Sequence, residues 1–289
     1  RKELKKAIEQ CELLGTTQDG MQIYLYQYQG SSAIFRELGR LREISFRTVG
    51  EGSGKRRDID KYDMDYQHLV LWDGSQLELV GAYRLACAQA IIDKHGRKGL
   101  YTDSLFSYSD AMTPYFAAGI ELGRSFVQPK YWGRKSLDYL WYGIGAFVKN
   151  YPQYRYLYGA VSVSNALPEP AKAMLVHYYQ HYYGAKQVIA TPNNEFKLTE
   201  QQLIQCANLF SGDDVKEDFV ELKHVLANMG AQVPTLFKQY TELCEPGGVQ
   251  FLSFSVDPDF NNCIDGLVLV DLEKVNGIPM SKITKVNGV

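Results

Sequence analysis

The sequence predicts an α/β fold, in which a twisted mixed sheet is flanked by helices and a smaller α+β cap follows towards the C-terminus. β-rich segments come first, strand and helix patterns alternate over 120–183, and helix patterns dominate 199–243. An alternating β-α-β-α order indicates a sheet with helices on both faces, because sequential elements pack as neighbours. We therefore expect a core domain at 1–184 and a C-terminal extension, packed on the core, at 185–289.

Hydrophobic periodicity defines the elements of the N-terminal half. A period of two with β-rich residues indicates strands, and a period of 3.6 indicates an amphipathic helix, here opening at Ser32 as N-cap. The Asp73-Gly74-Ser75 turn is the strongest hairpin signal of the chain. The expected elements are a strand at 22–28, a helix at 33–46, a flexible basic glycine-rich loop at 50–58, and hairpin strands at 68–72 and 77–86.

The C-terminal half shows longer helical patterns, punctuated by Pro234 and Gly247-Gly248. No internal repeat interrupts them. The expected elements are strands at 120–127, 155–164, 249–256 and 264–271, and helices at 134–149, 169–183, 199–209, 214–228 and 234–243.

Composition excludes several classes of function. The formal net charge of −2 gives no global attraction for nucleic acid, so no nucleic-acid partner is expected. The five cysteines are scattered without a C-x-x-C pair, which argues against a zinc site or a disulfide framework and favours a reducing compartment. No apolar run reaches the ~18 residues of a membrane span, and no secretory signal is visible. We expect a cytoplasmic protein with no metal and no permanently bound cofactor.

The most informative stretch is residues 120–141. It starts as a buried strand that carries Glu121 and Arg124, continues into a turn with Pro129, Gly133 and three cations, and ends in a helix. A basic turn at a helix N-terminus is suited to an anion, because backbone N–H groups and the helix dipole point at it. The spacing predicts a long, thin donor, held by its phosphate at the turn and reacting at its far end near Glu121.

Four ordered motifs carry a resemblance to a known family. They are Arg42-x-x-x-Phe46, Asp60-x-x-Asp63, Gly81-x-x-Arg84 and Glu121-x-x-Arg124. Together they resemble acyl-homoserine-lactone synthases, and are more similar to the bacterial N-acyltransferases of the ornithine-lipid and N-acyl amino acid ("hemolysin-like") type, within the GNAT superfamily. The resemblance covers residues 33–272 and implies a GNAT-like sheet.

What the resemblance implies is transfer of a fatty acyl chain from acyl-carrier protein, or from acyl-CoA, to the amine of an amino acid such as ornithine or glycine, for aminolipid synthesis. Glu121 would be the general base or would orient the substrate, and backbone N–H groups near Phe126 and Val127 would stabilise the oxyanion. The other implied site residues are Arg124 beside Glu121; Arg42, Asp60, Asp63 and Arg84 around the acceptor amino acid; and Lys130, Gly133, Arg134, Lys135 and Ser136 at the donor phosphate, where Lys135 replaces the second small residue of the usual coenzyme-A loop.

Several alternatives stay open. Glu121 could instead form a structural ion pair with Arg124 or Arg84, and Asp60 and Asp63 could belong to a solvated acidic turn. Other functions are signal synthesis resembling homoserine-lactone production, and a non-catalytic module that binds acyl chains or the carrier. The resemblance also suggests that such a domain can follow a lysophospholipid acyltransferase domain, with peripheral contact to the inner membrane surface.

Two histidine patterns are weaker. His68 and Asp73 match the H-x4-D spacing of glycerophosphate acyltransferases, but residues five apart on a strand point to opposite faces. His177 and His181 have an i, i+4 spacing without a third ligand, so we interpret them as core or surface residues. The tyrosines around them, Tyr178, Tyr179, Tyr182 and Tyr183, are interpreted as packing aromatics.

Overall fold

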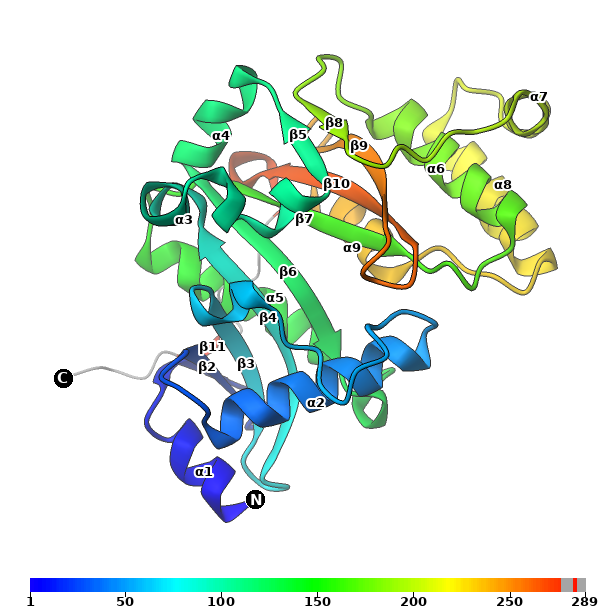
Figure 1. Ribbon diagram of the computed structural model, residues 1–289. Helices are drawn as coiled ribbons and strands as arrows, with labels where there is room; N and C mark the ends of the chain where they lie inside the picture. Colours follow the sequence, from blue (N-terminus) through cyan, green and yellow to red (C-terminus); the bar gives the residue numbers. More distant parts are fainter. Residues whose placement is uncertain (277–282, 285–289) are drawn as a thin grey trace. The chain divides into compact units, whose positions relative to one another are not determined.

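The computed structural model describes residues 1–276 and 283–284, and the chain divides into two compact units (Figure 1). The boundary expected at residue 184 falls inside the second unit. Of the described residues, the first unit holds 1–100, 116–155 and 283–284, and the second holds 101–115 and 156–276.

Antiparallel strands form the sheet of the first unit, in the order β11-β1-β2-β3-β4-β6. The hairpin predicted around Asp73-Gly74-Ser75 is confirmed as β3 and β4. The strands are β1 (Glu12–Thr17), β2 (Gln22–Gln27), β3 (Gln67–Asp73), β4 (Glu78–Cys87), β6 (Gly119–Val127) and β11 (Ile283–Thr284).

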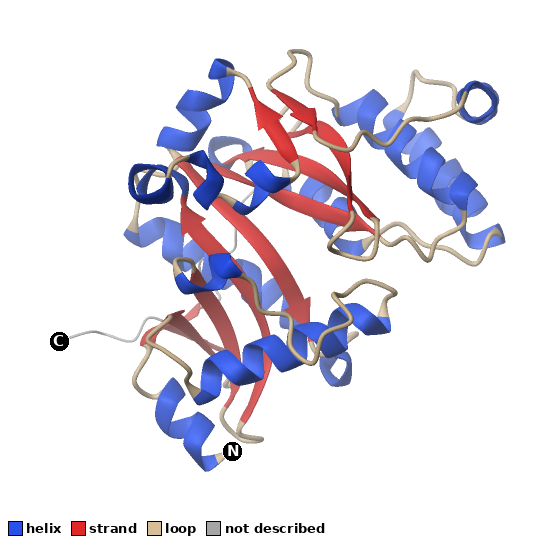
Figure 2. Ribbon diagram, viewed as in Figure 1, coloured by secondary structure: helices blue, strands red, loops and turns tan. Residues whose placement is uncertain are grey.

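Helices α2 (Ala33–Thr48) and α5 (Ser136–Asn150) cover opposite faces of this sheet (Figure 2). On β3, His68 contacts α2, whereas Leu69 lies against α5, and consecutive strand residues point to opposite faces. Gly143 permits the close packing of α5, since a Cβ there would lie 2.8 Å from Leu69 Cδ1. Ser32 caps α2 as expected, accepting a hydrogen bond from the N–H of Phe35 at 3.2 Å.

The pairing of β4 with β6 is interrupted by a β-bulge. Ala82 pairs with Phe126 and Arg84 with Gly123, so two residues of β6 stand opposite Tyr83 alone. Gly81 is required beside the bulge, because a Cβ there would lie 2.5 Å from the carbonyl oxygen of Phe126. This explains the glycine of the Gly81-x-x-Arg84 motif as a packing requirement.

The second unit contains two small antiparallel sheets and a group of helices. Tyr179, Phe237 and Phe251 pack ring to ring in its interior, with centroids 4.9–5.1 Å apart. Tyr178 and Tyr179 are buried, in agreement with their interpretation as packing residues. Its elements are β7-β10-β9 (Tyr156–Val163, Cys263–Asp271, Val249–Asp257), β5-β8 (Phe106–Tyr108, Ala190–Pro192), α6 (Glu169–Tyr183), α7 (Glu200–Leu209), α8 (Val215–Asn228) and α9 (Thr235–Leu243).

The predicted GNAT-like arrangement of strands flanked by helices is confirmed, and the expected elements are present within a few residues of their predicted ends. Within the described residues, no helix has the length and apolar character needed to cross a membrane. Elements that the periodicity missed are short: α1 (Lys2–Ile8), β1, α3 (Ala88–His95), α4 (Thr113–Ala117), β5, β8, β11 and the 3₁₀ turns. Of these turns, η1 (Lys61–Met64) and η5 (Pro129–Tyr131) flank residues of the candidate site.

Candidate functional site

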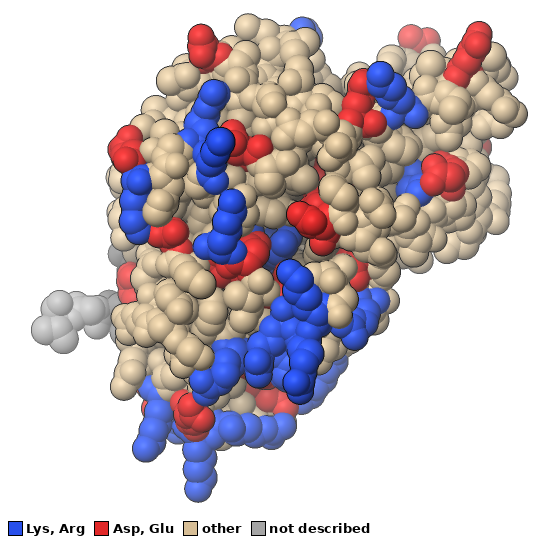
Figure 3. Space-filling model, viewed as in Figure 1, with Lys and Arg blue, Asp and Glu red and all other residues tan. Residues whose placement is uncertain are grey.

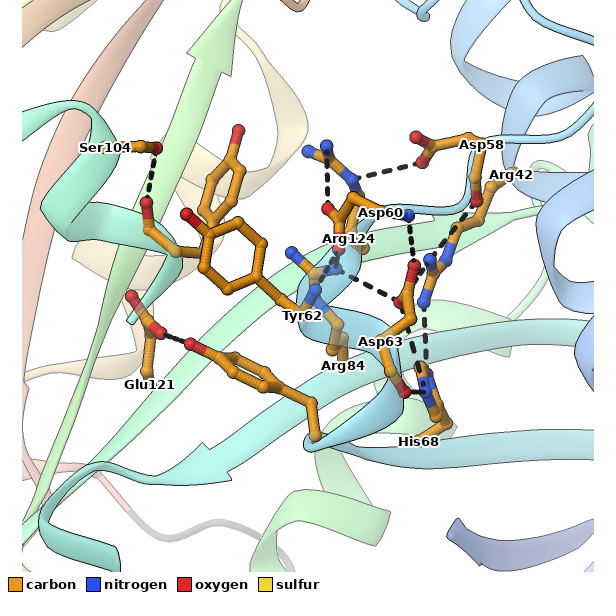
Figure 4. A network of polar contacts seen from close by, with 12 residues as sticks. Arg42, Asp58, Asp60, Tyr62, Asp63, His68, Arg84, Ser104, Glu121 and Arg124 are labelled. Carbon is orange, nitrogen blue, oxygen red and sulfur yellow. Dashed lines mark hydrogen bonds and ion pairs between the residues drawn. The ribbon is translucent and has the colours of Figure 1, made fainter. Parts of the chain in front are cut away.

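Three arginines from different elements of the first unit meet one acidic segment (Figure 4). Arg42 comes from α2, Arg84 from β4 and Arg124 from β6. Their partners Asp58, Asp60 and Asp63 lie in or just before η1. The sequence motifs therefore converge in space as expected, and we call these six side chains the Arg–Asp network.

Asp63 is the centre of the Arg–Asp network. Its Oδ1 lies 2.7 Å from Arg42 Nη1 and 3.1 Å from Arg84 Nη1, while its Oδ2 accepts from the N–H of Asp60 at 2.8 Å. Asp60 in turn lies 2.6 Å from Arg84. Because every carboxylate has a cationic partner, burial of these charges is compensated.

Burial divides the Arg–Asp network into two parts. The side chains of Arg42, Asp63 and Arg84 are at most 2% exposed, whereas those of Asp60 and Arg124 keep 23% and 12% exposure. Arg42 and Arg84 were expected around the acceptor, but a bound amino acid could reach them only by displacing their aspartates. Asp60 and Arg124 are thus the network residues placed to meet a ligand.

The bulge in β6 explains how Arg124 joins this network. Its φ is +47°, a left-handed conformation that non-glycine residues rarely adopt. A bulge of this kind redirects a side chain, and the Arg124 guanidinium lies 3.1 Å from Asp58 and 3.3 Å from Asp60.

The charges of the network set its protonation. Burial disfavours ionisation of Asp63, but Arg42 and Arg84 outweigh it and hold the pKa of this carboxyl well below its usual range. The same balance, with Arg84 as the main cation, lowers the pKa of Asp60. Burial opposes the charge of Arg84, yet Asp60 and Asp63 raise its pKa. Asp60, Asp63 and Arg84 are therefore ionised at neutral pH.

His68 belongs to this network, although its motif with Asp73 pointed elsewhere. It is fully buried, its Nδ1 lies 3.1 Å from Arg42 Nη2, and its Nε2 lies 3.0 Å from the carbonyl oxygen of Asp63. A carbonyl can only accept, so Nε2 carries the hydrogen and Nδ1 accepts from Arg42. Burial, reinforced by Arg42, lowers the pKa of His68 to about 3, so the imidazole is neutral. Asp73 instead bonds Ser75 and Tyr131, so the two do not form a dyad.

Glu121 is buried on β6 and accepts a hydrogen bond from the hydroxyl of Tyr66. Tyr66 is equally buried, and Arg84 lies over its ring at 5.1 Å from the centroid. Tyr66 thus links Glu121 to the Arg–Asp network. Sequence reasoning missed Tyr66, Asp58 and His68; the signal that could have found His68 is a polar residue in a buried strand, which must have partners.

Strand alternation separates the backbone N–H groups of β6. The N–H of Gln128 donates to the carbonyl oxygen of Val80. The backbone N–H and C=O groups of the even-numbered residues of β4 therefore point towards β6. Glu121 pairs with Ala86 and Gly123 with Arg84, so their N–H groups point towards β4. The N–H of Leu122, between them, points away from β4. After the bulge, the N–H of Phe126 points towards β4 and the N–H of Val127 points away from it.

This register bears on the expected oxyanion donors, Phe126 and Val127. Val127 is six residues from Glu121, about 20 Å along an extended strand, which is too far for both to act on one carbonyl. The N–H of Phe126 is directed at β4. Leu122 is adjacent to Glu121, and its N–H points away from β4.

The expected donor turn lies between η5 and α5, and its cations differ in their surroundings. Lys130 Nζ is 2.5 Å from Glu78 Oε2, so its charge is largely neutralised. Arg134 lies over the ring of Tyr131 at 5.2 Å, and Lys135 is exposed at the N-cap of α5. No side chain caps this helix N-terminus, and Gly133 has a φ of +74°. Ser136, the first residue of α5, is buried, and the first N–H groups of a helix have no partner within the helix.

The two histidines of the second unit, His177 and His181, take part in ring packing. The rings of His177 and His181 are stacked with centroids 6.2 Å apart, and His177 stacks equally on Phe210. Within residues 1–276 and 283–284, no group of three or more His, Cys, Asp or Glu side chains could hold a metal ion.

A family model and a solved structure are similar to parts of this chain. Residues 41–142 match the acetyltransferase (GNAT) domain family, a range that includes the Arg–Asp network, Glu121 and the donor turn. A solved CoA-dependent acyl-homoserine lactone synthase is 11% identical, covering 86% of this chain and 88% of its own, with a TM-score of 0.40.

Curated relatives are similar over most of the chain. A glycine N(alpha)-acyltransferase of Phocaeicola vulgatus is 32% identical over 257 residues, covering 84% of this chain and 78% of the relative. One of Bacteroides thetaiotaomicron is 30% identical, covering 95% and 85%. An L-ornithine N(alpha)-acyltransferase of Agrobacterium fabrum is 25% identical, covering 82% and 75%.

Proposed function

The chain belongs to the GNAT-domain N(alpha)-acyltransferases, and from this premise we propose that it transfers a fatty acyl chain from a thioester to the α-amine of an amino acid. Glycine is the first acceptor to test and ornithine the second, since relatives similar in sequence over most of the chain carry these acceptors in their names. The observation that carries the proposal is the buried hydrogen bond between Tyr66 and Glu121, because Glu121 lies on β6, the strand that leads to the proposed donor turn.

Glu121 is the proposed general base. Acyl transfer needs a neutral amine, and a carboxylate can accept its proton directly or through one water molecule. Tyr66 fixes one carboxylate oxygen, Oε2. The N–H of Leu122 is proposed to stabilise the oxyanion that forms when the amine attacks the thioester carbonyl.

The acceptor is proposed to bind at the partly exposed edge of the Arg–Asp network. Arg124 can pair with the carboxylate of the amino acid, and Asp60 with its ammonium group before deprotonation. Arg42, Asp63 and Arg84 hold these two residues in place and remain enclosed.

The donor is proposed to be a 4′-phosphopantetheine thioester, on acyl-carrier protein or on coenzyme A. Its phosphate would meet the uncapped N-terminus of α5, with the N–H of Ser136 and the side chains of Arg134 and Lys135. The arm would then run along β6, past Val127, towards Glu121. This route uses Phe126 and Val127 as donor contacts rather than as oxyanion donors.

The test measures thiol release from palmitoyl-carrier protein and from palmitoyl-CoA, with glycine and ornithine offered separately, and identifies the product by mass. The wild-type chain should form an N-palmitoyl amino acid. Glu121→Gln should lower kcat about 10²- to 10⁴-fold, the range for loss of a general base. Glu200→Gln on α7 is the matched control and should leave the rate unchanged.

Two results would overturn the proposal. Full activity of Glu121→Gln would remove the general-base role. Binding of the carrier protein without any thiol release from either donor would instead support a non-catalytic binding module.

A further inference from the structure

A cationic surface of the first unit lies outside the proposed chemistry. Figure 3 shows Lys and Arg side chains gathered over α2 and the loop that follows it. Two adjoining hollows, which share Arg40, are lined by these residues. The cations of this surface are Arg36, Arg40, Arg47, Lys55, Arg56 and Arg57, and we call it the α2 basic face.

A buried carboxylate holds the loop of this face against the helix. Glu43 on α2 is 3% exposed and accepts hydrogen bonds from the N–H and the hydroxyl of Ser53, at 3.2 and 2.8 Å, and from the N–H of Gly54 at 3.0 Å. Arg47 donates to the same carboxylate and to the carbonyl oxygen of Lys55. The loop therefore presents Lys55 and Arg56 in a fixed place beside the helix.

The face carries an excess of positive charge. Arg36, Arg40 and Arg47 pair with Glu3, Glu37 and Glu43. Lys55, Arg56 and Arg57 form no ion pair with a carboxylate of the described residues. These loop cations are exposed and remain available to an external anion.

Apolar side chains stand among these charges. Ile44 is 42% exposed and lines the same hollow as Arg40, Arg47, Lys55 and Arg56. Val49, at the end of α2, is 44% exposed. An exposed aliphatic side chain among cations, as Ile44 is, is a feature of segments that lie at a lipid interface.

We propose that the α2 basic face docks this protein onto a lipid surface with anionic headgroups. The loop cations would meet the phosphates, and Ile44 and Val49 would enter the headgroup region. An acidic protein would use the charges equally well, but it gives no reason for the aliphatic side chains, so the lipid surface is the partner that accounts for both observations.

Binding to vesicles tests the proposal without any substrate, so its outcome is independent of acyl transfer. The purified chain is sedimented with vesicles of phosphatidylcholine alone and of phosphatidylcholine mixed with phosphatidylglycerol. It should bind the anionic vesicles, and high salt should release it. Lys55→Gln with Arg56→Gln should weaken binding about fivefold for each charge removed. Ile44→Ser should weaken it about threefold or more, because less apolar surface is buried.

The control is Lys98→Gln with Lys149→Gln, which removes two exposed cations elsewhere on the same unit and should leave vesicle binding unchanged. Equal binding to neutral and anionic vesicles, or no binding to either, would overturn the proposal. So would a Lys55→Gln/Arg56→Gln variant that loses binding to an acidic carrier protein while it binds vesicles normally.

Discussion

Tyr66 donates its phenolic hydrogen to Glu121, and both side chains are only 1% exposed. The pair connects β6 to the end of η1, and Asp63 lies within this turn and Asp60 at its N-cap. A carboxylate that is to remove a proton from a substrate must be fixed in position, and this hydroxyl is the group that fixes it. Tyr66 is therefore proposed as a positioning residue for the general base.

Replacing Tyr66 by phenylalanine should lower kcat about tenfold while the KM for the amino acid changes little. The carboxylate would lose a hydrogen bond that favours its charged form, so the acid limb of the rate profile should move to higher pH. The pH dependence of kcat/KM measures this. Tyr24→Phe on β2, outside the network, is the control and should show neither effect. A Tyr66→Phe profile that overlays that of the wild type would leave the tyrosine a purely structural role.

Replacing Arg124 by glutamine should destabilise the fold by about 3 kcal/mol. Asp58 is 3% exposed, and its carboxylate would lose the guanidinium at 3.1 Å, leaving a buried charge without this partner. Glutamine meets the same left-handed backbone at this position, so the change isolates the ion pair.

Urea unfolding measures how much Arg124→Gln lowers the free energy of unfolding. Adding Asp58→Asn to Arg124→Gln should recover part of the loss, because the unpaired charge is then absent. Arg40→Gln, which breaks an exposed pair with Glu37, should cost less than about 1 kcal/mol. An Arg124→Gln variant that is no less stable than Arg40→Gln would contradict the network's structural role.

The sequence allowed most of the network to be foreseen, because its members stand in short motifs with fixed spacing. Arg42, Asp60, Asp63 and Arg84 were expected together and are together. Their separate tasks could not be foreseen, because exposure depends on which side chains cover them in space. The spacing of the motif does not show that the side chain of Asp60 stays partly exposed to solvent while that of Asp63 is buried.

The bulge in β6 marks the limit of periodicity. A regular strand would place Arg124 on the face opposite Gly123, away from α2. The extra residue and the positive φ of Arg124 reverse this, and neither leaves a sign in the pattern of apolar residues. The same bulge sets the register on which the proposed roles of Leu122 and Val127 rest, so these proposals could be made only with the strand pairing known.

His68 should make stability depend on pH. Its pKa is about 3 in the folded chain against 6.5 for an ordinary histidine, so the unfolded chain takes up the proton first. Stability should therefore fall as pH decreases from about 6.5 towards 3, by about 2 kcal/mol between pH 7 and pH 5. Asp60 and Asp63, whose lowered pKa values act the same way, add their loss only below about pH 4.

Urea unfolding at pH 7 and pH 5 checks this contribution of His68. The His68→Gln variant cannot take up the proton, so its stability should change less over this interval than that of the wild type. His177, whose pKa is also lowered by burial, is present in both proteins and cancels in the comparison. Equal pH dependence of the two proteins would show that His68 is protonated alike in the folded and unfolded chains.

The cations of the donor turn should contribute unequally to binding of the acyl donor, and replacing them one at a time should show this. Lys135→Ala should raise the KM for the acyl donor about tenfold, with kcat little changed, since a charge-assisted phosphate contact is lost. Lys130→Ala should change this KM less than about threefold, because Glu78 already neutralises that ammonium group at 2.5 Å. Glu78→Gln should lower the KM by releasing Lys130 to the donor, and Lys149→Ala at the far end of α5 serves as the control. Steady-state kinetics with the donor varied measure all four, and a larger effect of Lys130→Ala than of Lys135→Ala would mean that the donor phosphate displaces Glu78 rather than meeting the helix N-terminus.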